Sequence, residues 1–118
     1  MRRKPGSILP LEVDLIETAL TLRARGVHEF HGYLIAQAMR ERRDARSLTS
    51  HGTLYKALGR MRERGWLSAR WEDPAIAAEA ERPRRRLYAV TPLGETVYKE
   101  ATAAAQAPAA LRRETQPS

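Results

Sequence analysis

The sequence predicts a mainly α-helical fold that carries one small β-hairpin. Apolar residues recur at three- and four-residue spacing in four segments, which is the period of an amphipathic helix. In two short stretches, residues 67–71 and 84–91, the period changes to two, as expected of half-buried strands. The chain has 118 residues. That length allows one modest core and not two independent ones.

The first predicted helix follows Pro10 and stops near Gly26, after a leader of residues 1–9 that we expect to be flexible and basic. Its apolar positions are Leu11, Leu15, Ile16, Ala19 and Leu20. A second helix is predicted from the spacing of Ile35, Ala38 and Met39, and it runs into the polar loop "RERRDARSLTS".

The third predicted helix begins where Thr49 or Ser50 offers a side-chain oxygen as N-cap, and it ends near Gly65. One face of this helix is apolar and consists of Leu54, Ala57, Leu58 and Met61. The opposite face is polar and consists of Thr53, Lys56, Gly59, Arg60 and Glu63. This helix is therefore expected to pack on the core with one side and to expose a cationic side.

Two strands and a last helix complete the predicted domain of residues 10–91 and its C-terminal extension. Between the strands lies "EDPAIAAEAERPR", which we expect to form a long, mobile hairpin loop. Thr91 and Pro92 are suited to the N-cap and the first position of a helix over residues 92–107, with Leu93, Val97 and Ala101 facing inward. Pro108 should break this helix and leave residues 108–118 as a disordered tail.

Charge is the strongest global property of the chain. The net charge is +7, and residues 40–86 hold 13 Lys and Arg against 7 Asp and Glu, a surplus of 6. Such a surplus creates a positive field that attracts polyanions. The chain contains no cysteine, which excludes disulfides, thiolate metal sites and cysteine nucleophiles. No signal peptide or membrane span is recognisable, so a cytoplasmic location is expected.

No pattern indicates an enzyme, a cofactor or a metal site. The sequence lacks a Gly-rich phosphate loop, a pair of carboxylates in an apolar setting and a Ser-His-Asp set. His28 and His31 do not have the spacing of a zinc-binding helix, and no third ligand is near them in the sequence, so we expect ordinary loop residues. Trp66 and Trp71 are interpreted as core and rim packing of the strands, with a ligand cavity as the less favoured alternative.

The order helix, helix, helix, strand, long loop, strand is that of a winged helix-turn-helix, in which the third helix enters the major groove of double-stranded DNA and the hairpin contacts the backbone or a minor groove. Arg, Lys, Ser, Thr and His can pair with base edges or phosphates there. The candidate DNA-binding residues are Tyr33, Ser50, His51, Thr53, Tyr55, Lys56, Arg60, Arg82, Arg84, Arg85 and Arg86.

Each candidate also has a structural interpretation. Lys56 and Arg60 could form a solvated helix face, and Ser50 could act only as a cap. Tyr33 and Tyr55 could be packing residues with outward hydroxyls. The arginines of residues 82–86 could serve solubility. The alternative functions are therefore a winged helix that binds a protein or ligand without binding DNA, and an RNA-binding module, which the low aromatic content of 6% disfavours.

Three segments resemble the PadR family of bacterial transcriptional regulators, over roughly residues 8–105. They are "HGYLIAQAMRE", "SHGTLYKALGRMRERGWLSARWE" and "RPRRRLYAVTPLGE". The resemblance implies a winged-helix homodimer, joined through its C-terminal helix, that represses transcription from a palindromic operator. It also implies a response to a small aromatic or drug-like effector. Lys56 stands where many members have proline, which adds a cation to the expected DNA face.

Overall fold

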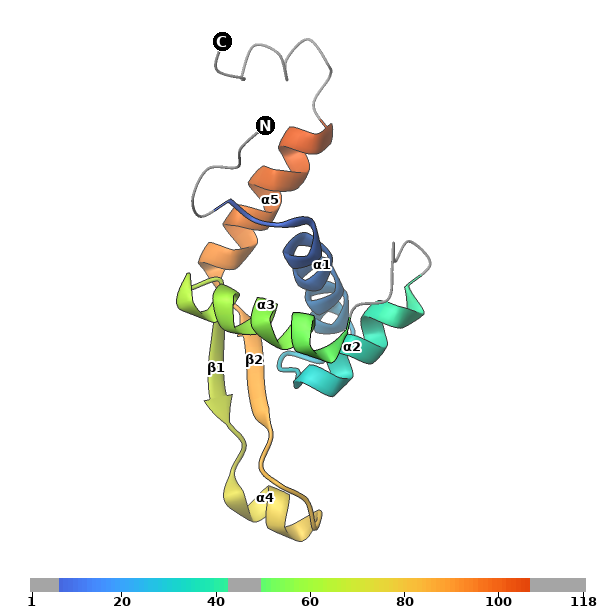
Figure 1. The fold of residues 1–118 in the computed structure, drawn as a ribbon, viewed down its shortest axis with the longest axis vertical. Helices are drawn as coiled ribbons and strands as arrows, with labels where there is room; N and C mark the ends of the chain where they lie inside the picture. The colour runs from blue at the N-terminus through green and yellow to red at the C-terminus, as the bar shows by residue number, and fades with distance from the viewer. Residues whose placement is uncertain (1–6, 43–49, 107–118) are drawn as a thin grey trace.

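The computed structural model describes residues 7–42 and 50–106. Their elements follow the order α1 (Pro10–Ala24), α2 (Gly32–Glu41), α3 (His51–Glu63), β1 (Leu67–Trp71), α4 (Pro74–Glu79), β2 (Arg86–Val90) and α5 (Pro92–Gln106). Three helices gather at the root of a long hairpin, and α5 leaves this group on the side opposite the hairpin (Figure 1). The predicted fold class, mainly helical with one hairpin and a C-terminal helix, is confirmed. The expected leader and tail fall almost entirely outside the described residues.

The core lies between α1, α2, α3 and the root of the hairpin. Its buried side chains are Leu15, Ile16, Ala19, Phe30, Ile35, Ala36, Leu54, Leu58, Met61, Trp66, Leu67 and Tyr88. The apolar stripe predicted for α3 is buried as expected, because helical periodicity places Leu54, Ala57, Leu58 and Met61 on one side. These contacts fix the direction in which the opposite side of α3 faces.

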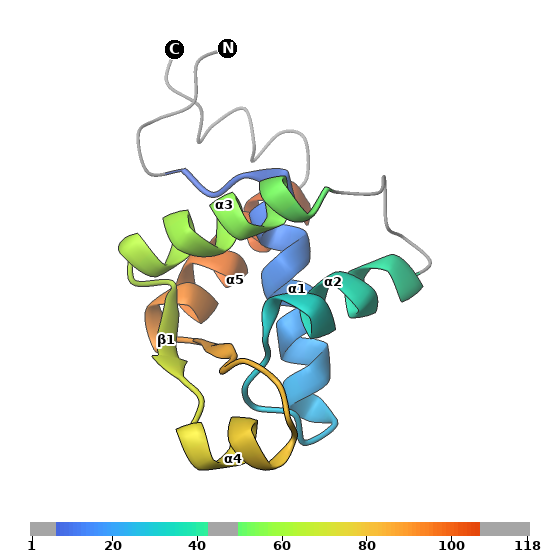
Figure 2. The same ribbon diagram turned by 60° about the horizontal axis from the view of Figure 1, so that its bottom comes forward.

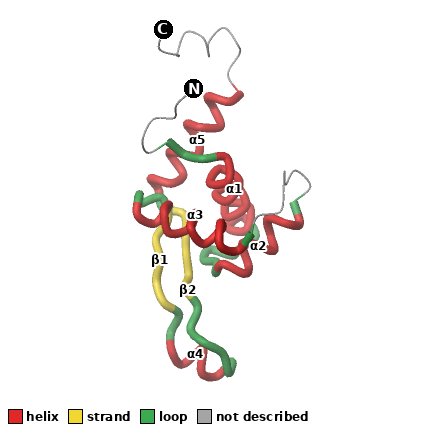
Figure 3. The backbone as a smooth tube through the Cα atoms, viewed as in Figure 1, coloured by secondary structure: helices red, strands yellow, loops and turns green. Residues whose placement is uncertain are grey.

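The hairpin, which we call the wing (residues 67–90), is built on two paired strands, β1 and β2 (Figure 3). The strands are antiparallel, with Leu67 opposite Val90 and Trp71 opposite Arg86. The segment before α2 also pairs with it. Phe30 N–H donates to the carbonyl of Tyr88 at 2.9 Å, and Tyr88 N–H donates to the carbonyl of Phe30 at 2.8 Å. This exchange of two bonds attaches the segment just before α2 to the wing.

Two glycines set the geometry around the wing. Gly65 ends α3 with φ of 78°, a left-handed conformation that side-chain-bearing residues rarely adopt. The next N–H, of Trp66, donates back to Met61 at 2.9 Å, as in a Schellman motif. Gly94 lies so close to the wing that a Cβ there would overlap the carbonyl oxygen of Trp66. The predicted cap of α5 is confirmed, since Thr91 Oγ1 accepts from Gly94 N–H at 3.0 Å.

The expected mobile loop of the wing is wrong in part. Residues 74–79 form α4, which lies at the far end of the wing from α3 (Figure 2). Asp73 caps it by accepting from Ala75 N–H at 2.8 Å, and Ala77 is buried. The inward orientation expected for Leu93 is also wrong, because that side chain is 50% exposed, whereas Val97 packs against the core.

Candidate nucleic-acid interface

The N-terminal half of α3 presents a polar, exposed surface. The exposed residues on it are Ser50, His51, Thr53, Tyr55 and Lys56. Ser50 caps the helix by accepting from Thr53 N–H at 3.2 Å, and its hydroxyl donates to Thr53 Oγ1 at 2.9 Å. All five are candidates from the sequence, and the structure brings them together at one helix end, where the helix dipole favours an anion.

The start of α2 lies beside this surface, and the Tyr55 side chain of α3 packs over Gly32, the first residue of α2. A Cβ on Gly32 would lie only 2.5 Å from the Tyr55 ring and hydroxyl, so glycine permits this close approach. His31 caps α2, with Nδ1 accepting from Leu34 N–H at 3.2 Å. Burial lowers the pKa of His31, and the nearby positive charges of Arg85 and Arg82 lower it further. The expected ordinary loop histidine therefore has a structural role as an N-cap.

The wing meets these two helix ends at a shallow hollow of about 240 Å³. Its lining residues are His31, Gly32, Tyr33, Tyr55, Arg84, Arg85, Arg86 and Tyr88. Five of the eleven sequence candidates thus line one hollow, although they come from three separate segments of the chain. Tyr33 and Tyr55 are 58% and 51% exposed, and Tyr55 also packs against Gly32, so both the DNA-contact and the packing interpretation stand.

Glu72 accepts hydrogen bonds from three residues of the arginine-rich segment 82–86. Its carboxylate accepts two bonds from the Arg82 guanidinium, at 2.5 and 2.9 Å, and a longer one of 3.4 Å from Arg85 N–H. The hydrogen bonds from Arg82 hold the pKa of Glu72 down at about 2. Its carbonyl oxygen accepts from Arg84 Nε at 2.9 Å. Arg82 is therefore committed to an internal ion pair, which leaves Arg84, Arg85 and Arg86 as the cations of the hollow.

The sequence predicts that Arg60 and Lys56 share one exposed cationic face of α3. The structure instead turns the Arg60 guanidinium toward α1. Its Nε donates to Glu12 Oε2 at 2.6 Å, and another guanidinium nitrogen donates to the carbonyl of Ser7 at 2.7 Å. The Glu12 side chain is fully buried, and its other oxygen accepts from Leu9 N–H. The structure thus gives Arg60 the role of neutralising a buried carboxylate of α1.

Charge is distributed unevenly along the wing. Residues 73–81, which include α4, contain three acidic residues, Asp73, Glu79 and Glu81, and no Lys or Arg. Arg70 precedes this segment and is paired with Glu29, whereas the other arginines of the wing follow it, and those that line the hollow lie where β2 begins. The wing is therefore negative at its far end and positive near the helices.

Trp71 is a residue of this surface that was not among the DNA-binding candidates, since the sequence favoured packing for it over a ligand cavity. Its side chain is 53% exposed, and the guanidinium carbons of Arg84 and Arg86 lie 5.8 and 5.0 Å from the centre of its ring. These distances are those of cation–π contacts. The two-residue alternation from Leu67 placed Trp71 correctly on a strand, but only the register opposite Arg86 relates it to the cations.

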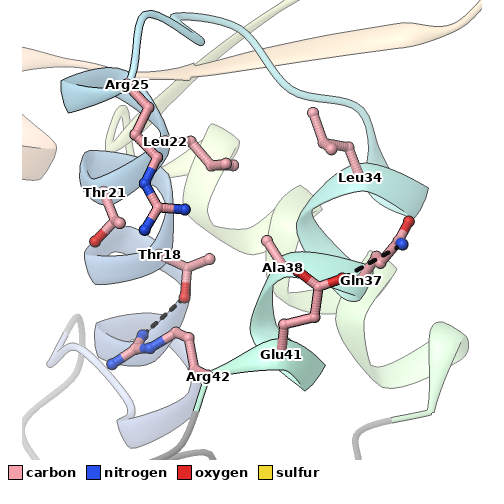
Figure 4. Close-up of a pocket in the computed structure, with 9 residues that line it drawn as sticks. All are labelled: Thr18, Thr21, Leu22, Arg25, Leu34, Gln37, Ala38, Glu41 and Arg42. Carbon is pink, nitrogen blue, oxygen red and sulfur yellow. Dashed lines mark hydrogen bonds between the residues drawn. The ribbon is translucent and has the colours of Figure 1, made fainter.

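A second hollow, of about 430 Å³, lies between α1 and α2 (Figure 4). Its lining residues are Thr18, Thr21, Leu22, Arg25, Leu34, Gln37, Ala38, Glu41 and Arg42. Arg42 joins the two helices, donating to Thr18 Oγ1 at 2.7 Å and to Glu17 Oε1 at 2.8 Å.

Within residues 7–42 and 50–106 no cluster of His, Cys, Asp or Glu suits a metal ion. In the same ranges, no helix is long and apolar enough to span a membrane.

A three-helix group whose third helix exposes a polar side next to a two-stranded wing defines a DNA-binding winged helix-turn-helix. The comparisons give the family. The model of the transcriptional regulator PadR-like family matches residues 22–100, and the chain belongs to this family. No curated protein matches the chain.

Several solved structures share the fold. A transcriptional regulator from Clostridium thermocellum is 20% identical, with 79% of each chain covered and a TM-score of 0.61. A PadR family transcription regulator from Clostridium difficile is 22% identical, with 77% of this chain and 83% of that chain covered and a TM-score of 0.58. PadR of Bacillus subtilis, solved in complex with operator DNA, is 15% identical, with 79% of this chain and 46% of that one covered and a TM-score of 0.61.

Proposed function

We propose that this chain is a transcriptional repressor that binds a palindromic operator as a homodimer, with α3 in the major groove and the arginines of the wing on the phosphate backbone. The observation that carries the proposal is the hollow where the ends of α2 and α3 meet Arg84, Arg85 and Arg86. The complex of Bacillus subtilis PadR with operator DNA supports it by analogy of fold.

The residues divide into two roles by position. Lys56, Thr53 and His51 lie on the exposed part of α3, and we assign them to the base edges and nearby phosphates of the major groove. The three arginines and the hydroxyls of Tyr33 and Tyr55 surround the hollow, whose size and charge suit a backbone phosphate. Arg60 and Arg82 are left out of both roles, because internal carboxylates hold their guanidinium groups.

The homodimer is supported by the position of α5. One side of α5 is joined to α1 by the ion pair between Arg23 and Glu95, at 2.6 Å, and by the packing of Val97 and Tyr98. The helix continues beyond the three-helix group (Figure 1). A second copy packed along α5 would present two α3 helices to half-sites one helical turn, roughly 35 Å, apart. Sedimentation of the purified chain tests this, and a monomer at micromolar concentration would contradict it.

DNA binding is tested by salt dependence. Replacing Arg84, Arg85 or Arg86 with Ala should weaken binding to all duplexes and reduce the slope of log affinity against log salt by about one per lost phosphate contact. Arg62→Ala is the matched control, because Arg62 is an exposed arginine of α3 that does not line the hollow. Wild-type affinity and slope in all three wing variants would refute the proposed backbone contact.

The operator is found by selecting bound fragments from random duplex DNA. The recovered motif should contain two inverted half-sites, and Lys56→Ala should change the preferred bases rather than lower the salt slope alone. An RNA competitor in the same assay separates duplex DNA binding from RNA binding. A selection that recovers no motif would contradict sequence-specific recognition.

A further inference from the structure

We infer that Trp71 is a positioning residue of the DNA interface, which holds Arg84 and Arg86 in the orientation that meets the phosphate backbone. The inference rests on the proposed function and adds a residue to it. Trp71 ends β1 directly opposite Arg86, the first residue of β2, so the strand register places one aromatic ring among the wing cations.

The contacts of the two arginines differ from those of their neighbour Arg82. Arg82 is held by the Glu72 carboxylate, whereas no hydrogen bond or ion pair holds the Arg86 guanidinium within the described residues. Arg84 is bonded only through Nε, to the Glu72 carbonyl, among those residues. The ring of Trp71 is therefore the group that both guanidinium ions share, at 5.8 and 5.0 Å from its centre.

An aromatic ring suits this task better than a carboxylate. A carboxylate beside Arg84 and Arg86 would neutralise them and occupy their N–H donors, as Glu72 does for Arg82. A cation–π contact attracts the charge and leaves the donors available for a phosphate. A free arginine side chain also loses rotamer freedom when it is immobilised, and a ring that restricts it beforehand reduces this loss on binding.

The exposure of Trp71 agrees with this role. Trp66 also contacts two arginines, Arg60 and Arg64, but it is buried and its ring belongs to the core. Trp71 is 53% exposed, so its ring is not required to fill the interior. Two like charges near one exposed ring repel each other, and a polyanion relieves that repulsion.

The test compares Trp71→Leu with Trp71→Tyr, since leucine keeps apolar bulk and tyrosine keeps a π face. The probe is a labelled mixture of random duplexes of about 30 base pairs, titrated at about 50 mM salt, where backbone contacts dominate. We expect Trp71→Leu to weaken binding about fivefold and Trp71→Tyr to stay within about twofold of wild type. Ile76→Ala is the matched control, because Ile76 lies on the same wing and is also 53% exposed.

Two further measurements separate positioning from other roles. In an Arg84→Ala, Arg86→Ala background, Trp71→Leu should weaken binding no further, because its effect passes through those side chains. In the free protein, NMR relaxation of the arginine Nε–H groups should show Arg86 less ordered in Trp71→Leu than in wild type, with thermal midpoints within a few degrees of each other.

Several outcomes would overturn the inference. The inference fails if Trp71→Leu binds DNA with wild-type affinity, or if Trp71→Leu and Trp71→Tyr lose equal affinity. It also fails if Trp71→Leu weakens binding as much in the Arg84→Ala, Arg86→Ala background as in wild type, or if it leaves the NMR order of the Arg86 side chain unchanged. The proposed function fails separately. A wild-type chain that binds no duplex overturns both, whereas a wild type that binds while Trp71→Leu has no effect overturns only the role of Trp71.

Discussion

Arg60 and Glu12 join the third helix to the first through a bond of 2.6 Å between Nε and Oε2. The Glu12 side chain is fully buried and that of Arg60 is 30% exposed. A buried carboxylate is costly without a partner, and its cost is met here by Arg60 and by Leu9 N–H. Arg60 thus adds a polar link between α3 and α1 to the apolar contacts that seat α3 on the core.

Arg60→Ala should lower the free energy of unfolding by about 2–4 kcal/mol, because it leaves Glu12 buried and uncompensated. Urea unfolding of the variant and of Arg62→Ala, whose exposed side chain serves as control, measures the difference. At urea concentrations and temperatures where it is folded, the Arg60→Ala variant should select the same operator bases as wild type. Unchanged stability with altered base preference would instead restore Arg60 to the DNA surface.

Gly94→Ala should destabilise the protein, although alanine is the better helix former. The added Cβ would overlap the Trp66 carbonyl oxygen, so α5 would have to move, at a cost of about 1–3 kcal/mol. Gly59→Ala in α3 is the control, since a Cβ there meets nothing within 4 Å and should stabilise by about 0.5–1 kcal/mol. Calorimetric midpoints of the two variants should shift in opposite directions. Equal shifts would show that the approach of α5 to the wing is looser than described.

The outer part of the wing, between the strands and α4, should lose the Glu72–Arg82 ion pair only in strong acid. The folded-state pKa of Glu72 is about 2, below the ordinary value of 4.5, because Arg82 bonds to the ionised form. The stabilisation is therefore complete above pH 4.5 and is lost as the pH falls through that value toward 2. A carboxyl NMR titration of Glu72 measures this directly. Arg82→Ala should return the midpoint toward the ordinary value, and a midpoint near 4.5 in wild type would contradict the pairing.

His31 should make the stability of the domain fall on acidification below neutral pH. Its Nδ1 caps α2 only while unprotonated, and burial together with Arg85 and Arg82 lowers its pKa in the folded state. Stability is thus highest above the unfolded pKa of about 6.5 and declines as the pH falls through the lower folded value. His31→Asn keeps an accepting cap and should remove this dependence, whereas His31→Ala should cost about 1 kcal/mol at neutral pH. Parallel pH profiles for wild type and His31→Asn would exclude the histidine as the cause.

The elements that local pattern determines were predictable from the sequence. The buried stripe of α3 follows from periodicity, and the start of α5 follows from Thr91 and Pro92. The same kind of start, Asp73 followed by Pro74, precedes α4 and could have indicated it. The interpretation as a loop failed there because α4 is only six residues long and rich in alanine, so it shows no clear apolar period.

The partners of the arginines were not predictable in this way. Arg60 meets a carboxylate 48 positions away in the sequence, and that distance is closed only by the packing of α1 on α3. The convergence of Tyr33, Tyr55 and Arg86 likewise depends on how α2, α3 and the wing meet. Periodicity indicates which side of an element faces outward, but it does not indicate which outward groups are already paired.

In the proposed DNA complex, the acidic residues at the far end of the wing, Asp73, Glu79 and Glu81, would also constrain how a duplex approaches. The negatively charged duplex would be repelled by the α4 end of the wing and attracted by the arginines near the helices. The hairpin would therefore act as an electric dipole in the field of the DNA. In that complex the encounter would thereby be oriented before any base is touched. The length of the wing would then act as a spacer that limits the angles at which α3 can enter a groove.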